Sequence, residues 1–214
     1  MEDIILMGAG GHCKVIIDII KGNNTYNIVG ILDPQSKGLS ILDIPIIGDD
    51  NLLLDLRRKG VSNAFICIGA MGSTSYSVRN ELLDKLRRIG FKLPKLIHRN
   101  AVVSDFSSIG DGTCVMAGVI VNAGAMIGEN CIINTGVIIE HDCIIANNTH
   151  ISPGTSIAGG VKIGNNGHVG IGSSIIQGIN IGNNVVIGAG AAVISDISDD
   201  SVAVGVPAKI IRCR

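Results

Sequence analysis

Three adjacent titratable residues, Glu140-His141-Asp142, lie in a part of the chain that carries almost no other charge. An imidazole titrates near neutral pH, so it can accept a proton from an incoming nucleophile, and an adjacent carboxylate can fix its tautomer and increase its basicity. The alternative is a solvated turn with no chemical role. The scarcity of charge around the three residues favours a general base at His141.

The sequence leaves open which carboxylate assists this imidazole. In a regular strand Glu140 and Asp142 lie on one side and His141 on the other, so simple alternation brings neither acid to the ring. A corner in the chain, or a residue from a neighbouring subunit, would be needed to make the contact.

A second candidate site is the glycine-rich turn GAGGHC, from Gly8 to Cys13. Between a strand and a helix, such a turn leaves backbone N–H groups free at the helix N-terminus, where phosphate binds favourably. Cys13 stands where a dinucleotide fingerprint requires Gly or Ala, although Asp33 ends the second strand, as a ribose-binding acid would. A structural turn and an NAD site are the alternatives. A nucleotide-linked substrate is favoured, because the α/β half is too short for a two-lobed dinucleotide fold.

The first 95 residues alternate between strand and helix patterns. The expected strands are 3–7, 27–33 and the buried segment 63–69. The expected helices are 13–22, which Gly22 would stop, 51–60, which Asp50 would cap, and 75–90, which ends at Gly90. This order predicts a small α/β unit with a parallel sheet.

From Ile97 onward, an isoleucine or valine recurs every six residues without an insertion. The seventeen positions are Ile97, Val103, Ile109, Val115, Val121, Ile127, Ile133, Ile139, Ile145, Ile151, Ile157, Ile163, Val169, Ile175, Ile181, Ile187 and Val193. A six-residue unit provides one short strand and one turn, and three units can close a triangular coil whose neighbours stack at about 4.8 Å. The repeat therefore predicts a solenoid of about five coils, with the branched residues pointing inward.

His150 and His168 are 18 residues apart, one full coil, so they should lie one above the other on the same edge. Such a pair could bind a metal ion, line a ligand groove or occupy a solvent-facing row. An open catalytic zinc site normally uses three protein ligands. We therefore expect no metal here.

Aliphatic side chains must fill the core, because 46% of the residues are hydrophobic while the chain has no Trp, 2 Tyr and 3 Phe.

A net charge of −1 provides no basic surface for nucleic acid or anionic membranes. Glycines interrupt the apolar run in MEDIILMGAGGHCK, so the start resembles neither a secretion signal nor a spanning helix, and a cytoplasmic protein is expected. The six cysteines show no CxxC pair, which favours reduced, buried thiols.

The repeat region is poor in charge, which predicts that its surface meets something other than water. Between residues 103 and 194 the charged residues are Asp105, Asp111, Glu129, Glu140, Asp142 and Lys162. Side-by-side packing of identical solenoids is the economical explanation.

Four motifs together resemble one family along almost the whole chain: GAGGHC at the start, the NAFICIG strand, the hexapeptide run with INTGVIIEHD, and GVPAK at 205–209. This is the NeuD/PglD-like family of sugar O/N-acetyltransferases of bacterial surface-glycan biosynthesis. The resemblance implies a Rossmann-like nucleotide-sugar-binding domain over residues 1–95. It also implies a left-handed parallel β-helix over 96–214, with a short C-terminal tail, that binds acetyl-CoA and carries catalysis. The left hand comes from the resemblance, because parallel crossovers are generally right-handed.

The resemblance also implies acetyl transfer from acetyl-CoA to a nucleotide-linked aminodeoxy sugar, such as a UDP-4-amino-4,6-dideoxy sugar, by a homotrimer with active sites at subunit interfaces. His141 matches the family's base and Asp142 the acid that tunes it. The cofactor would meet His150, Gly159, Ile171, Ala189 and Asn134. The nucleotide sugar would meet Gly10, Gly11, His12, Asp33 and Gly69. The alternatives are O-acetylation of a sialic-acid-type sugar and a non-catalytic, nucleotide-binding trimeric scaffold.

Overall fold

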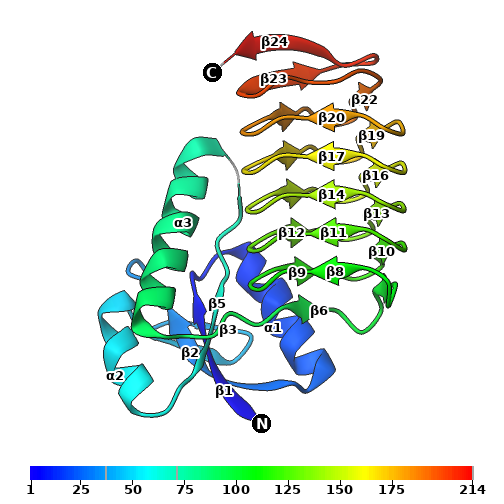
Figure 1. Cartoon of the computed structure of the whole chain (residues 1–214). Helices are drawn as coiled ribbons and strands as arrows, with labels where there is room; N and C mark the ends of the chain where they lie inside the picture. Colours follow the sequence, from blue (N-terminus) through cyan, green and yellow to red (C-terminus); the bar gives the residue numbers. More distant parts are fainter. Residues whose placement is uncertain (37, 71, 214) are drawn as a thin grey trace. The chain divides into compact units, whose positions relative to one another are not determined.

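The computed structural model describes residues 1–36, 38–70 and 72–213, without the side chains of 72–75. The chain divides into two compact units, Met1–Leu96 and Ile97–Arg214 (Figure 1). No helix in the described ranges combines the length and the apolar character that crossing a membrane requires.

The first unit is a five-stranded sheet with helices on both faces (Figure 1). The sheet order is β3-β4-β2-β1-β5, parallel except for the antiparallel pair β3 and β4. Its strands are β1 (Glu2–Met7), β2 (Tyr26–Leu32), β3 (Ser40–Ile41), β4 (Ile44–Gly48) and β5 (Asn63–Ile66). Its helices are α1 (Gly11–Asn23), the 3₁₀ turn η1 (Asp50–Leu52), α2 (Leu53–Arg58) and α3 (Gly72–Ile89).

Alternation along β1 supplies both faces of this sheet, because successive side chains of a strand point to opposite sides. Ile5 and Met7 join a buried cluster with residues of α2 and α3, among them Leu53 and Leu86. Helix α1 buries one stripe at helical spacing, formed by Cys13, Ile16, Ile17, Ile19 and Ile20. Helices thus cover both faces of the sheet, and the carboxyl ends of its parallel strands lie together at one edge.

Local details of this unit differ from the sequence expectation. Helix α1 continues past Gly22 to Asn23 and is capped by Asn24, which has a left-handed φ of 53° that asparagine adopts readily. The side chain of Asp49, rather than Asp50, caps the next turn by accepting from the Asn51 N–H at 2.9 Å. The hairpin of β3 and β4 was not expected, because its two-residue turn uses Leu42 and Asp43 in place of the usual Asn-Gly pair.

The repeat region contains seventeen strands of two residues between 96 and 193, a range that is described throughout. They are β6 (Leu96–Ile97), β7 (Val102–Val103), β8 (Ser108–Ile109), β9 (Cys114–Val115), β10 (Ile120–Val121), β11 (Met126–Ile127), β12 (Ile132–Ile133), β13 (Ile138–Ile139), β14 (Ile144–Ile145), β15 (His150–Ile151), β16 (Ser156–Ile157), β17 (Lys162–Ile163), β18 (His168–Val169), β19 (Ser174–Ile175), β20 (Asn180–Ile181), β21 (Val186–Ile187) and β22 (Ala192–Val193). Every expected six-residue position is the second residue of one of these strands, which confirms the repeat.

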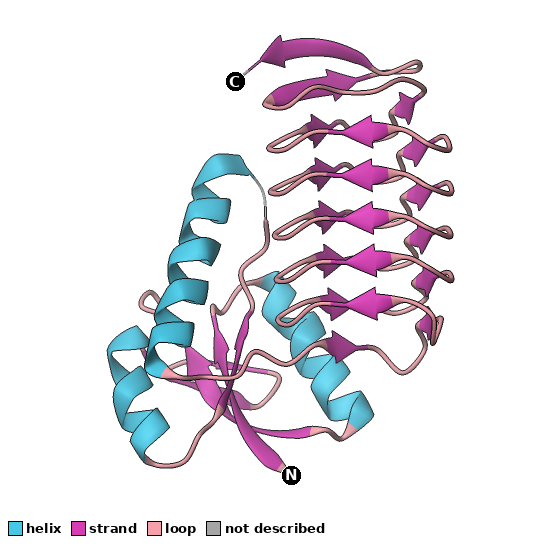
Figure 2. Ribbon diagram, in the orientation of Figure 1, coloured by secondary structure: helices cyan, strands magenta, loops and turns pink. Residues whose placement is uncertain are grey.

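Three parallel sheets form the sides of this prism (Figure 2). Each strand pairs with the strand 18 residues away, as Ile133 does with Ile151, which confirms the triangular coil. The repeated isoleucines and valines are buried from Val115 to Val193, whereas Ile97, Val103 and Ile109 are half-buried in the first coil. The antiparallel pair β23 (Ser201–Val204) and β24 (Lys209–Cys213) closes the other end.

The cysteines follow the expectation in part. None of the six, all of which lie in the described ranges, forms a disulfide, and five are buried in the two units. Cys213 is the exception, because it lies on the outer, exposed strand β24. Burial raises the pKa of the Cys143 thiol above its ordinary value.

Candidate functional site

His141 and Asp142 form a turn between β13 and β14, at a corner of the prism. His141 Nδ1 lies 2.9 Å from Asp142 Oδ2. Strand alternation would have separated the two side chains, but the strand ends at Ile139 and Asp142 adopts a left-handed φ of 59°. The corner therefore makes the contact within one protomer, with Asp142 as the partner of the imidazole.

This pair faces outward, because the side chain of His141 is 63% exposed and that of Asp142 is 73% exposed. Backbone bonds hold the corner to its neighbours. The Asp142 N–H donates to Ala123 O at 3.1 Å, and the Gly160 N–H donates to His141 O at 2.9 Å. The backbone of the corner thus fixes the position of the imidazole, while most of its side chain stays exposed.

Gly159 lies directly against the imidazole. A Cβ at this position would come within 2.6 Å of both Cε1 and Nε2 of His141. Gly159 stands 18 residues after His141, so it occupies the same corner one coil further along. The structure therefore brings these two predicted site residues together.

His150 and Asn134 form a second group. Asn134 Nδ2 lies 3.3 Å from His150 Nε2. His150 pairs in register with His168 on β18, with ring centroids 4.9 Å apart and the rings nearly perpendicular, which confirms the expected stacking. In the described part of the chain, no group of three His, Cys, Asp or Glu residues is arranged to hold a metal ion.

Ile171 and Ala189 lie at another corner, away from His141. They occupy successive turns there, between β18 and β19 and between β21 and β22, and the Gly190 N–H donates to Ile171 O at 2.8 Å. Ile171 is 56% exposed. Within one protomer, the predicted cofactor residues are therefore divided between two corners and the outer face of β15.

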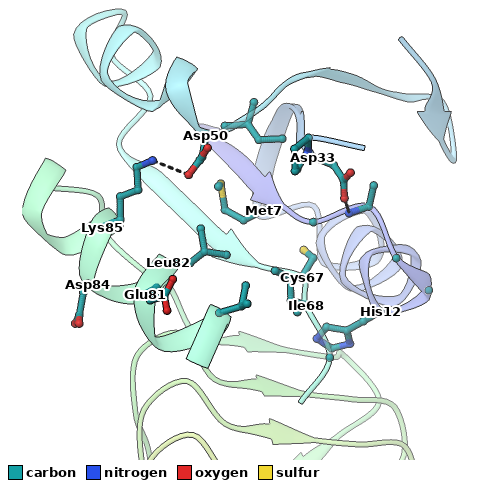
Figure 3. A pocket seen from close by; sticks show the side chains of 18 of the residues that line it. Met7, His12, Asp33, Asp50, Cys67, Ile68, Glu81, Leu82, Asp84 and Lys85 are labelled. Carbon is teal, nitrogen blue, oxygen red and sulfur yellow. Dashed lines mark hydrogen bonds and ion pairs between the residues drawn. The ribbon is translucent and has the colours of Figure 1, made fainter. Parts of the chain in front are cut away.

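A cavity of about 890 Å³ opens at the carboxyl ends of β1, β2 and β5 in the first unit (Figure 3). All five residues expected to meet the nucleotide sugar line it: Gly10, Gly11, His12, Asp33 and Gly69. The ends of parallel strands are where ligands bind in open α/β sheets. The volume lies in the range of small-molecule sites.

The carboxylate of Asp33 holds the shape of this cavity. Its Oδ2 accepts from the Ala9 N–H at 2.9 Å, and its Oδ1 accepts from the Gln35 N–H at 2.9 Å. Asp33 thereby ties the glycine turn to the loop after β2.

Beneath the turn, a hydrogen bond with the Cys67 thiol lowers the pKa of the buried Cys13 thiol. Burial and the charge of Asp33 act in the opposite direction and raise that pKa.

The glycines of this turn differ in their roles. Gly8 has φ of +102° and a Cβ there would lie 2.8 Å from Ile68 Cγ1, so the fold itself requires glycine. No atom lies within 4 Å of a Cβ built at Gly10, Gly11 or Gly69. Packing within the protein does not demand glycine at these three positions, and the backbone stays open to the cavity.

Sequence reasoning missed the charged wall of this cavity. Four of its residues lie on one face of α3, at helical spacing: Glu81, Asp84, Lys85 and Arg88. Lys85 Nζ contacts Asp50 Oδ2 at 2.5 Å across the opening (Figure 3). The spacing of three and four residues was the available signal, but only the packing of α3 decides which face meets the cavity.

Two family models match the chain. Residues 3–86 match the PglD N-terminal domain. Residues 124–159 match the bacterial transferase hexapeptide model of six repeats. The expected fold class, an α/β domain followed by a left-handed parallel β-helix, is confirmed by these matches and by the structural neighbours.

The chain resembles a UDP-N-acetylbacillosamine N-acetyltransferase of Bacillus subtilis (strain 168), at 38% identity over 117 residues. The match covers 55% of this chain and 52% of the relative, so the aligned part spans about half the length of that curated relative.

Among solved structures, the perosamine N-acetyltransferase of Caulobacter crescentus, a histidine-to-asparagine variant in complex with CoA and GDP-perosamine, is 37% identical. It matches with a TM-score of 0.93 over 99% of this chain and 98% of its own. The acetyltransferase domain of PglB from Neisseria gonorrhoeae FA1090, in complex with acetyl coenzyme A, is 34% identical, with a TM-score of 0.90 over 98% and 99% of the two chains. Identity at this level over nearly the full length establishes that the chain belongs to the NeuD/PglD-like family of hexapeptide-repeat sugar acetyltransferases.

Proposed function

We propose that this protein transfers an acetyl group from acetyl-CoA to the amine of a nucleotide-linked aminodeoxy sugar in bacterial surface-glycan biosynthesis. The observation that carries the proposal is the His141–Asp142 pair, joined at 2.9 Å on an exposed corner of the hexapeptide prism. The family to which the chain belongs supports the same chemistry, since relatives are named for N-acetylation of UDP-linked and GDP-linked amino sugars.

His141 acts as the general base in this reaction. As the sugar amine attacks the thioester carbonyl, a C–N bond forms, and the imidazole accepts the proton that the amine loses. The C–S bond then breaks, and the proton held by the imidazole passes to the CoA sulfur, so that CoA leaves as a thiol. Asp142 holds Nδ1 in its protonated form, so Nε2 carries the lone pair that accepts the proton.

Gly159 supports the carbonyl side of the same step. The neighbouring N–H groups are engaged, that of Ala158 with Ile175 O and that of Gly160 with His141 O. Among the described residues, none accepts a hydrogen bond from the Gly159 N–H. A backbone donor beside the imidazole would stabilise the charge that develops on the carbonyl oxygen.

We further propose a homotrimer. Ile171 and Ala189 occupy a different corner from His141, so one acetyl-CoA would reach both only if adjacent protomers brought unlike corners together. The outer face of the prism supports such packing, since Met126 on β11 and Ile144 on β14 are both exposed apolar side chains. Sedimentation equilibrium would measure a mass of three chains, and a monomer would contradict this arrangement.

The cavity of the first unit is proposed to bind the nucleotide part of the sugar substrate. The support is the open glycine turn and the charged side chains of Lys85 and Arg88, which suit phosphate. Substituting Asp33→Ala should raise KM for the nucleotide sugar by roughly tenfold, the scale of one lost charge-assisted hydrogen-bond network, and leave KM for acetyl-CoA unchanged. Asp55→Ala, on the exposed side of α2, is the matched control.

The direct test measures thiol release from acetyl-CoA with UDP-, dTDP- and GDP-linked amino sugars. Wild type should release thiol with at least one acceptor, and His141→Ala should lose at least about a hundredfold in turnover, the usual scale for a general base. His98→Ala removes an imidazole outside the proposed sites and should keep full turnover. No release with any amine, from folded protein, would rule out the proposal.

The same assay separates the two alternative functions. An O-acetylated sugar loses its acetyl group in mild alkali, whereas the amide expected here survives, and mass spectrometry distinguishes them. A non-catalytic scaffold would keep its activity in cells after His141→Ala. Acetyl-CoA and nucleotide sugars are cytoplasmic metabolites, so we place the reaction in the cytoplasm.

A further inference from the structure

The carboxylate of Asp142 occupies space that the residue one coil below leaves empty. Gly124 stands 18 residues before Asp142, at the same corner of the prism. A Cβ built on Gly124 would lie 2.5 Å from Asp142 Oδ1, with the next nearest atoms, Cγ and the backbone N, at 3.4 and 3.5 Å. The conflict is therefore confined to the tip of one side chain.

The other oxygen of the same carboxylate contacts the imidazole. Asp142 Oδ2 lies 2.9 Å from His141 Nδ1, while Oδ1 points at Gly124. The two oxygens belong to one planar group, so moving Oδ1 away from Gly124 also moves Oδ2. A side chain at Gly124 would therefore displace the carboxylate that contacts the imidazole.

Contacts with surrounding side chains do little to hold the His141–Asp142 pair in place. Both side chains of the pair are more than 60% exposed, so few neighbouring atoms restrict them. What restricts them is the corner backbone, where the Asp142 N–H is bound to Ala123 O, together with the glycines on the adjoining coils. We propose that Gly124 is a positioning residue that acts through Asp142 to orient His141; this inference rests on the proposed function.

The test compares Gly124→Ala with Gly118→Ala. Both glycines have left-handed φ, +76° and +69°, so alanine meets the same backbone strain at either position. A Cβ at Gly118 meets only Gly136 atoms at 3.9 Å, which is ordinary contact. The two variants should therefore show similar losses of thermal stability and differ only at the His141–Asp142 pair.

In acetyl transfer, Gly124→Ala should lower kcat by about tenfold or more, with KM for acetyl-CoA within about twofold, because a base held in the wrong orientation transfers protons poorly. Gly118→Ala should keep kcat within about twofold of wild type. In an Asp142→Gly background the added Gly124→Ala should change kcat by less than about twofold, since no carboxylate remains to be displaced. Equal kcat values for Gly124→Ala and Gly118→Ala would overturn the inference.

A crystal structure of Gly124→Ala decides the geometry without reference to activity. The separation of His141 Nδ1 and Asp142 Oδ2 should exceed about 3.5 Å, beyond hydrogen-bonding distance. Retention of the 2.9 Å contact in that variant would refute the positioning role. If the wild type transferred no acetyl group, the proposed function would fail, while this structural result would still decide the role of Gly124.

Discussion

Substituting Gly159→Ala adds one methyl group against the imidazole of His141. The new Cβ would lie 2.6 Å from Cε1 and Nε2 and 3.2 Å from Cδ2. The φ of Gly159 lies outside the left-handed region, so alanine meets no backbone strain there. The substitution also keeps the Gly159 backbone N–H that we assign to the carbonyl oxygen. Its effect should therefore come from displacement of the ring.

The expected magnitude follows from that distance. Ordinary van der Waals contact begins at 3.4 Å, so the ring must move by roughly 0.8 Å. A misplacement of about 1 Å can cost about a hundredfold in rate. That factor corresponds to roughly 2.7 kcal/mol of activation free energy. We expect kcat to fall by about this factor while the thermal unfolding midpoint changes little, because the ring is exposed and free to move outward.

The assay is steady-state thiol release, measured for wild type, Gly159→Ala, His141→Ala and the double variant. In the His141→Ala background there is no ring to displace, so the added Gly159→Ala should have little further effect on turnover. The reasoning is refuted if Gly159→Ala keeps wild-type turnover. A further large loss in the double variant would instead assign the effect to the carbonyl side of the reaction.

Two further predictions concern stability and thiol reactivity. Hydrogen bonds from the backbone and side chain of Asn183 lower the pKa of Asp199. This interaction stabilises the fold fully at pH values above the ordinary carboxyl pKa, and the stabilisation is lost as the pH falls through the lowered pKa of the folded state. Asp199→Ala should therefore lower Tm at pH 7, and the Tm difference from wild type should shrink below about pH 4. The control Asp105→Ala should change Tm little. A Tm difference for Asp199→Ala that does not depend on pH would contradict this reasoning. Native alkylation should label Cys213 first, because it is exposed, and the five buried cysteines only on unfolding. Mass spectrometry of wild type and Cys213→Ser measures this order, and rapid labelling in the variant would show that a buried thiol is accessible.

The prism could be predicted almost residue by residue, because its contacts repeat the sequence period. A strict spacing of six without insertions places residue i against residue i+18, so Ile133 must meet Ile151 and His150 must meet His168. The α/β unit was less predictable at its boundaries. Asn24 and Asp49 took the capping roles expected of Gly22 and Asp50, since neighbouring residues with similar capping ability compete and packing selects between them.

The sequence predicted one wall of the cavity but not the opposite one. A glycine turn after a buried strand must lie at the carboxyl edge of a parallel sheet, so Gly10, Gly11 and Asp33 could be placed together. The opposite wall could not be placed, because the helical pattern of α3 does not say how far the helix is rotated about its axis. Packing sets that rotation and brings Lys85 to Asp50.

The sequence alone determined the period of the prism, its inward-facing side chains and the titratable cluster at Glu140, His141 and Asp142, because these depend on composition and spacing along one chain. Only the tertiary structure decided that Asp142, rather than Glu140, contacts His141, and that glycines on the adjoining coils leave room for both side chains. The physical reason is that strand alternation stops at a corner. Beyond it, a left-handed φ and the stacking of neighbouring coils set the direction of each side chain.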